Sequence, residues 1–172
     1  MNNKQQQFQK MKFKLLEKKA DLFKADGENE TRSYGLISGY ASIFENTDSH
    51  GDVVVQGAFK DSLAQLQGQG EMPKMLWQHD HLQPIGRWTK MVEDNKGLYV
   101  EGMVLLDLQK GKEAYELLKN NAIDGLSIGY EVVESEQGSY SGERRLTKLN
   151  LHEISLVTFA ANGDAKVHLV KQ

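Results

Sequence analysis

A serine between small residues marks the part of the sequence with the clearest capacity for chemistry. Ser127 lies in residues 125–130, Gly-Leu-Ser-Ile-Gly-Tyr, within a stretch rich in β-forming residues. A segment with two histidines, residues 75–81, precedes it, and a segment with a histidine and a glutamate, residues 151–157, follows it. Because serine attacks a carbonyl poorly unless a base takes its proton, these segments could supply a nucleophile, a base and an orienting carboxylate.

Other interpretations of the same residues stay open at this point. A serine in a strand is more often a small packing residue, and a histidine is more often a hydrogen-bonded structural side chain. A metal site is a further alternative, since two histidines two residues apart on a strand can face one ion. The candidate ligands for such a site are His79, Asp80, His81, His152 and Glu153.

A series of sequence blocks, in a fixed order, carries a resemblance to a known family. The chain resembles the caudoviral prohead serine proteases, the prohead maturation proteases of tailed bacteriophages, over roughly residues 35–170. The shared order and spacing are more specific than any single block. The blocks are residues 39–44 (GYASIF), 48–54 (DSHGDVV), 57–59 (GAF), 75–80 (MLWQHD), 84–86 (PIG), 125–130 (GLSIGY) and 153–157 (EISLV), with Ala161 and Asn162.

The resemblance implies a role for three residues. Ser127 matches the family nucleophile and His79 matches the histidine of the LWQHD block, whereas His81 has no counterpart. Glu153 matches the acidic residue that is taken as the third member of the site. His152 is the alternative third member, because the herpesvirus maturation protease, assemblin, uses a second histidine there.

The alternation of side chains along a strand predicts which of these residues share a face. His152 and Glu153 should point to opposite faces, so that only one of them reaches the site. Ser155 should share the face of Glu153, as a hydrogen-bond partner or a core residue. Trp77 and His79 should lie on one side of a strand that includes residues 74–78.

Two further features bear on the resemblance. Assemblin holds the oxyanion with an arginine pair, but Arg144 and Arg145 precede the acidic block here instead of following it, so surface salt bridges are the favoured interpretation. A proline usually stands before the alanine-asparagine pair in the family, and this chain departs from that pattern at residues 159–162. His50 lies in a predicted loop, where we expect a role in turn geometry.

Composition limits the possible classes of protein. The chain has 172 residues, with 39% hydrophobic and 26% charged residues, which fits one globular domain. A net charge of −3 argues against nucleic acid as the main partner, although residues 10–24 are locally basic. The absence of cysteine excludes disulfides, thiolate zinc sites and cysteine nucleophiles. No segment has the length and apolarity of a membrane helix or a signal peptide, so a cytoplasmic location is expected.

Periodicity and turn residues predict the elements that must position the candidate site. Residues 1–24 should form a polar and basic N-terminal tail or extension, and residues 25–172 a single protease domain. Ala114, Leu117 and Leu118 should share the buried side of the second helix. The predicted strands are residues 36–44, 53–55, 74–78, 86–92, 98–106, 126–133, 144–159 and 167–170, and the predicted helices are residues 58–67 and 109–120.

These elements predict an α+β fold that is mainly β. The alternation is too irregular for βαβ repeats, which favours a closed or partly open antiparallel β-barrel of about seven strands flanked by two or three helices. The resemblance implies the same fold, because the phage family is thought to share the closed barrel of assemblin.

The resemblance also implies a function and its setting. We expect a serine endopeptidase that needs no cofactor and cleaves scaffold or capsid-protein segments, and itself, inside the assembling prohead in the host cytoplasm. Its expected partners are the major capsid protein precursor or scaffold protein and further copies of itself, with no nucleic acid and no membrane. The chain stops directly after its last predicted strand, which suggests a trimmed or mature form. The alternatives are a metal-binding β-barrel hydrolase that uses His79, His81 and His152, and a non-catalytic capsid assembly module.

Overall fold

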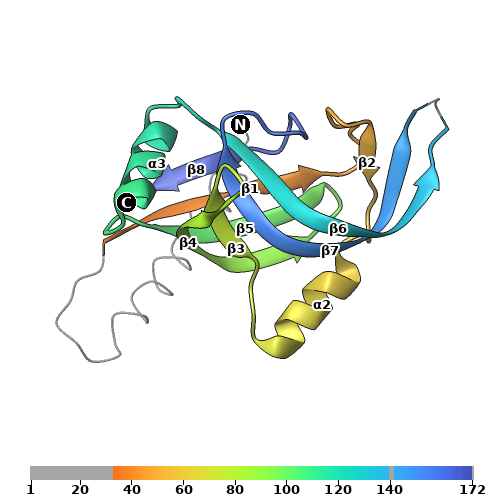
Figure 1. Cartoon of the computed structure of the whole chain (residues 1–172), viewed down its shortest axis with the longest axis horizontal. Coiled ribbons are helices and arrows are strands. Elements are labelled where there is room, and N and C mark those ends of the chain that lie inside the picture. Colours follow the sequence, from red (N-terminus) through yellow and green to blue (C-terminus); the bar gives the residue numbers. More distant parts are fainter. Residues whose placement is uncertain (1–32, 140–141, 172) are drawn as a thin grey trace, which may run out of the picture. The chain divides into compact units, whose positions relative to one another are not determined.

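Strands dominate the computed structural model of the protein, which describes residues 33–139 and 142–171 (Figure 1). The predicted tail at residues 1–24 lies outside these described residues. The described residues form the strands β1 (Tyr34–Ile43), β2 (Asp52–Val54), β3 (Lys74–Trp77), β4 (Asp80–Glu93), β5 (Gly97–Leu105), β6 (Gly125–Gln137), β7 (Arg144–Val157) and β8 (Val167–Lys171), with the helices α2 (Lys60–Gln69) and α3 (Gln109–Lys119).

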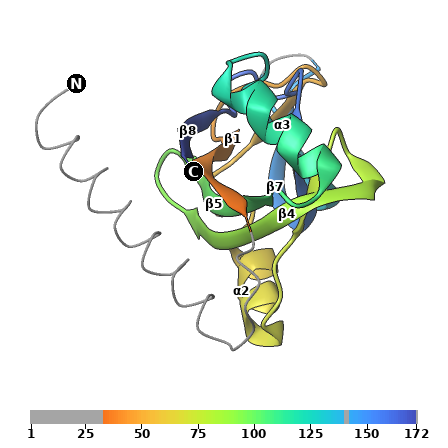
Figure 2. The same cartoon turned by 90° about the vertical axis from the view of Figure 1, so that its left-hand side faces the viewer.

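All eight described strands belong to one curled sheet. The strand order is β2-β7-β3-β4-β5-β1-β8, and β6 pairs along the other edge of β7. The curl brings the start of β6 beside the segment that leads into β8, through a bridge between Gly125 and Lys166. Figure 2 looks along the curl and shows α3 across one side of it and α2 at another. The prediction of a mainly β, barrel-like fold flanked by helices is confirmed.

The sheet is mixed, whereas the sequence analysis predicted a wholly antiparallel one. β7 pairs in parallel with β2 at residues 144–146 and with β3 at residues 153–156, while β6 runs antiparallel along its other edge. Parallel partners are joined by long connections, which short-range sequence patterns do not show. β7 is therefore the strand to which β2, β3 and β6 are all hydrogen-bonded.

The core lies inside the curl and beneath the helices. Trp88 is 2% exposed and donates its indole N–H to the carbonyl of Ile154, which ties β4 to β7. In α3 the buried residues are Gly111, Ala114, Tyr115 and Leu118, a spacing of three and four residues that suits a 3.6-residue period. The prediction for Leu117 was wrong: its side chain is 37% exposed, because Tyr115 occupies the buried stripe instead.

The largest difference in element bounds concerns the connection between β3 and β4. Sequence patterns place a strand at residues 74–78 and the next at 86–92, but β4 already begins at Asp80. Trp77 pairs with Asp80, so that only Gln78 and His79 form the turn. His79 is therefore a turn residue, and the prediction that it shares a strand face with Trp77 was wrong.

Candidate active site

His79 lies in a tight hairpin turn with an uncommon backbone conformation. The φ angles of Gln78 and His79 are 53° and 59°. Positive φ at both central residues is the pattern of a type I′ turn, whose twist suits a two-residue hairpin but which usually contains asparagine or glycine. For residues with larger side chains this conformation is unfavourable. Contacts outside the turn must therefore hold it in place.

Those contacts come from the end of β7. The backbone N–H of Gln78 donates to the carbonyl of Leu156 at 3.0 Å, and that of His79 donates to Ser155 Oγ at 3.1 Å. The Gln78 side chain donates to Thr158 Oγ1 at 2.7 Å and accepts from the Thr158 N–H at 3.3 Å. Sequence reasoning missed the pairing of Gln78 with Thr158, because it joins segments 80 residues apart and no periodicity reveals it.

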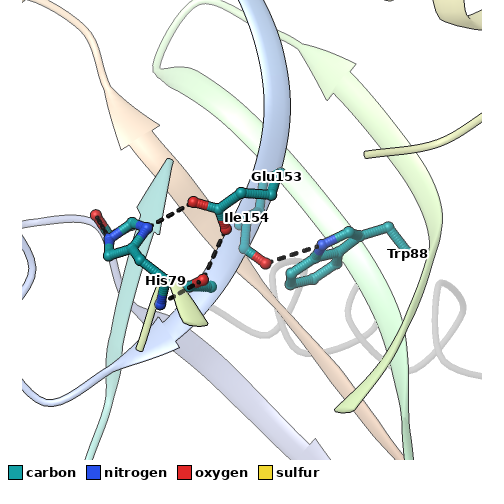
Figure 3. Close-up of polar contacts among 6 residues, drawn as sticks. His79, Trp88, Glu153 and Ile154 are labelled. Atoms are coloured by element: carbon teal, nitrogen blue, oxygen red, sulfur yellow. Dashed lines mark hydrogen bonds and ion pairs between the residues drawn. The ribbon is translucent and has the colours of Figure 1, made fainter. Parts of the chain in front are cut away.

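The three residues proposed for catalysis lie in hydrogen-bond contact in the order Ser127, His79, Glu153. Ser127 Oγ lies 2.9 Å from His79 Nε2. His79 Nδ1 lies 2.5 Å from Glu153 Oε1 (Figure 3). The carboxylate favours the tautomer with the proton on Nδ1, which leaves Nε2 free to accept the Ser127 proton. This is the arrangement that activates a serine for nucleophilic attack.

Strand register explains why Ser127 and Glu153 reach the same imidazole. In the β6–β7 pair, Ser127 lies opposite Ser155, and Gly129 lies opposite Glu153. A Cβ atom on Gly129 would lie 2.2 Å from Glu153 Oε1, so a glycine is needed for the carboxylate to lie across β6. The space that Gly129 leaves free of a side chain is occupied by the Glu153 side chain.

Glu153 is held on both of its oxygens. It is 5% exposed, and Ser155 Oγ donates to Oε2 at 2.6 Å while His79 contacts Oε1. Ser155 itself is fully buried and also accepts from the backbone of His79. His152 is exposed, as alternation along β7 requires. The geometry thus brings Glu153, and not His152, to His79.

The electrostatic environment of His79 suits a base that becomes a cation. The hydrogen bond to Glu153, together with its charge, raises the pKa of His79 above the usual value of 6.5, while partial burial opposes this rise. The raised pKa means that Glu153 stabilises the imidazolium form. That form arises when Nε2 takes the serine proton.

The remaining sequence candidates lie in other arrangements. Arg144 forms a bidentate pair with Asp52, at 2.8 and 2.6 Å, and Arg145 pairs with Glu45 at 2.6 Å, which fits the salt-bridge interpretation. His81 is exposed at the start of β4. Within residues 33–139 and 142–171, no group of three or more histidine, aspartate and glutamate residues is arranged to hold a metal ion.

A cavity of about 180 Å³ opens beside Ser127 and His79. Its walls come from β1, the 48–54 segment, β6 and the segment after β7. A substrate carbonyl placed against Ser127 would have this cavity next to it.

Comparison with known proteins gives a consistent family assignment. The family model for the caudovirus prohead serine protease matches residues 20–172. A prohead protease of Enterobacteria phage HK97 is 33% identical over 151 residues, covering 87% of this chain and 64% of that protein. A prohead protease of Escherichia phage T5 is 29% identical, covering 78% of this chain and 62% of that protein. The chain thus spans just under two thirds of the length of these two relatives.

A third relative and two solved structures extend the comparison. A capsid polyprotein of Pseudomonas phage PAJU2 is 35% identical over 102 residues, covering 56% of this chain and 15% of that protein. The bacteriophage T4 capsid assembly protease gp21 superposes with a TM-score of 0.60 at 11% identity, over 71% of this chain and 80% of that one. The KSHV protease, solved with a hexapeptide phosphonate inhibitor, superposes with a TM-score of 0.53 at 10% identity, over 81% and 66%. These likenesses establish the fold.

Within the described residues, no helix is long and apolar enough to cross a membrane.

Proposed function

Because the chain belongs to the caudovirus prohead serine protease family, we propose that it is a serine endopeptidase of phage head maturation. The observation that carries this proposal is the hydrogen-bonded series of Ser127, His79 and Glu153. A nucleophile, a base and a buried carboxylate in that order suit acyl transfer. The family assignment adds the class of reaction, which is peptide-bond hydrolysis.

The proposed mechanism is an acyl-enzyme route. Ser127 Oγ attacks the scissile carbonyl, and His79 Nε2 takes its proton. Glu153 keeps the proton on Nδ1 and stabilises the imidazolium. His79 then gives its proton to the leaving amine, and the C–N bond breaks. A water molecule repeats the sequence on the acyl-enzyme, with His79 as base, and releases the acid product and Ser127.

The proposed substrates are segments of the major capsid protein precursor or of a scaffold protein, and the chain itself. Two comparisons support capsid-related substrates: one relative is a capsid polyprotein, and one structural neighbour is a capsid assembly protease. The proposed place of action is the interior of the assembling prohead in the host cytoplasm. Self-association into a homo-oligomer is part of the same proposal.

A cleavage assay with point variants tests this function. Purified wild type, Ser127→Ala and His79→Ala are incubated with the capsid precursor from the same phage, and products are followed by intact mass. Ser135→Ala, an exposed serine on the same strand β6, serves as the control. We expect cleavage by wild type and Ser135→Ala, and a loss of several orders of magnitude, about 10⁴-fold or more, in the other two.

The outcomes separate the proposed roles from the alternatives. Circular dichroism establishes that each variant is folded before the assay. Equal cleavage by all four proteins would contradict the assigned site, and loss of cleavage on chelation would favour the metal-dependent alternative. No cleavage by folded wild type would favour the assembly module.

A further inference from the structure

Two large apolar side chains close in sequence to the residues of the His79 turn are almost fully exposed. Leu82 is 88% exposed and Phe159 is 91% exposed. The other exposed large apolar side chains among the described residues reach at most 44%. Single apolar side chains scattered over a surface are ordinary, whereas apolar side chains gathered at one place mark a contact site. The positions of Leu82 and Phe159 in the fold therefore decide what they indicate.

Leu82 lies in an irregular part of β4, directly after the turn that carries His79. Trp77 of β3 is paired with Asp80, but residues 81–83 have no partner on β3 in the ladder. The backbone N–H of Leu82 donates to Asp80 Oδ1 at 2.9 Å, which stabilises this local bend. Bulges of this kind redirect side chains and are common beside active sites. The bulge thus presents Leu82 to solvent at the end of the turn.

Phe159 is joined to the same turn from the end of β7. It directly follows Thr158, whose hydroxyl accepts from the Gln78 side chain at 2.7 Å and whose backbone N–H donates to that side chain at 3.3 Å. Gln78 precedes His79 and forms the turn with it. The two hydrogen bonds therefore hold the chain that carries the Phe159 ring beside the turn, while the ring itself stays exposed.

The chemistry of peptide cleavage identifies what must pass this surface. In the proposed mechanism His79 Nε2 gives its proton to the leaving amine, so this nitrogen must come within hydrogen-bond distance of the imidazole. Because consecutive Cα atoms are only about 3.8 Å apart, the first residues after the scissile bond stay close to the His79 turn. Neither Leu82 nor Phe159 lines the cavity beside Ser127, so the two apolar side chains form a separate surface.

We propose that Leu82 and Phe159 bind an apolar side chain of the substrate on the leaving-group side, within the first two residues after the scissile bond. Contact with such a side chain removes apolar area of both partners from water. Hydrogen bonds already hold the backbone at both positions, so binding has little backbone order to create. This assignment rests on the proposed protease function, since it needs the leaving amine to lie at His79.

The N-termini that cleavage creates test the assignment without a known substrate sequence. A library of N-acetylated peptides with randomised internal residues is digested, and the products with a free N-terminus are sequenced by mass spectrometry. Each new N-terminus reports the residues that followed the scissile bond. Relative to their frequency in the library, wild type is expected to yield leucine, isoleucine, methionine and phenylalanine at the first or second position about tenfold more often than glycine and serine.

Serine variants separate this surface from other exposed apolar residues. Leu82→Ser and Phe159→Ser should each reduce the apolar enrichment about threefold, and the double variant should abolish it. Leu108→Ser is the matched control, because Leu108 is 43% exposed at the N-cap of α3, where serine is favourable. Its cleavage profile should equal that of wild type.

Thermal stability and molar mass provide readouts that are independent of activity. Because Leu82 and Phe159 are exposed, the double variant should keep the Tm of wild type, whereas a structural role would lower it. New N-termini without apolar enrichment, or equal enrichment in the double variant, would overturn the inference and leave the protease function standing. An unchanged profile with a lower molar mass by light scattering would assign the surface to self-association instead. A folded wild type that cleaves neither the capsid precursor nor the library would overturn the function itself.

Discussion

Glu153 uses both of its carboxylate oxygens to hold other residues of the site. One carboxylate oxygen contacts the imidazole of His79, and the other accepts from Ser155, whose oxygen in turn accepts from the His79 backbone. The same buried side chain is therefore linked to both the ring and the main chain of His79, the proposed base. A neutral amide would lack the charge that stabilises the imidazolium.

Replacement of Glu153 separates its role from that of His152. Glu153→Gln should lower kcat by about 10³–10⁴-fold with little change in KM, because an amide can favour the wrong imidazole tautomer. His152→Ala should keep nearly full activity, since this side chain is exposed on the opposite face of β7. Steady-state kinetics on one peptide substrate provides the comparison, and equal losses in both variants would contradict the assignment.

The pH dependence of the reaction follows from the raised pKa of His79. Only the neutral imidazole can accept a proton, so kcat/KM should rise with pH through a pKa that lies above 6.5. Removal of the carboxylate in Glu153→Gln should move this acidic limb to lower pH, because the charge that favours the imidazolium is then absent. An acidic limb at the same pH in both proteins would show that another group controls the profile.

At the scale of elements, β7 and the turn before β4 determine the site. β7 supplies Glu153 and Ser155 directly and fixes β6, and so Ser127, by register. It also anchors the turn that carries His79. Two strands and one turn thus place all three groups.

Most elements could be predicted from the sequence, but their connections could not. α3 was predicted to within a residue, because its apolar residues recur at helical spacing. α2 was predicted to within two residues at each end, because it ends at Gly70. Alternation also predicted the opposite faces of His152 and Glu153. The turn at His79 escaped prediction, because its positive φ angles are held by a hydrogen bond to Ser155, 76 residues away, and not by local residue types.

The register of β6 and β7 makes Gly129 a sensitive position. In Gly129→Ala the added methyl would meet the Glu153 carboxylate, so the carboxylate must move away from His79. We expect kcat to fall about 10²-fold or more, because a displacement of about 1 Å in a catalytic group has effects of this size. Gly163→Ala, where a Cβ meets no atom within 4 Å, is the matched control and should keep wild-type kinetics.

On the scale of the whole described unit, the curl of the sheet depends on a close approach between β1 and the segment before β8. Tyr40 donates its backbone N–H to the carbonyl of Lys166, and Leu126 of β6 donates to that of Ala165. The same short segment therefore joins β1 to β6. The cavity beside Ser127 is lined by both strands, so its shape depends on this closure.

A glycine on β1 makes this approach possible. A Cβ on Gly39 would lie 2.1 Å from the Lys166 carbonyl oxygen, and a backbone atom has little freedom to move aside. Gly39→Ala should therefore destabilise the protein by about 1–3 kcal/mol or more. Gly68→Ala, within α2 and with open space around it, should instead stabilise by about 0.5–1 kcal/mol. Urea unfolding of both variants measures the contrast, and equal stability would contradict the role of Gly39.

Because hydrogen bonds to β7 and Thr158 hold the His79 turn, the proposed site can assemble only after this part of the chain has been synthesised. The ribosome makes His79 first, then Ser127, and only later residues 153–158, which hold the turn and orient the ring. At about 5–20 residues per second, the interval from His79 to this last segment is roughly 4–15 s. In a nascent chain the three groups of the proposed site therefore cannot come together until residues 153–158 have been made.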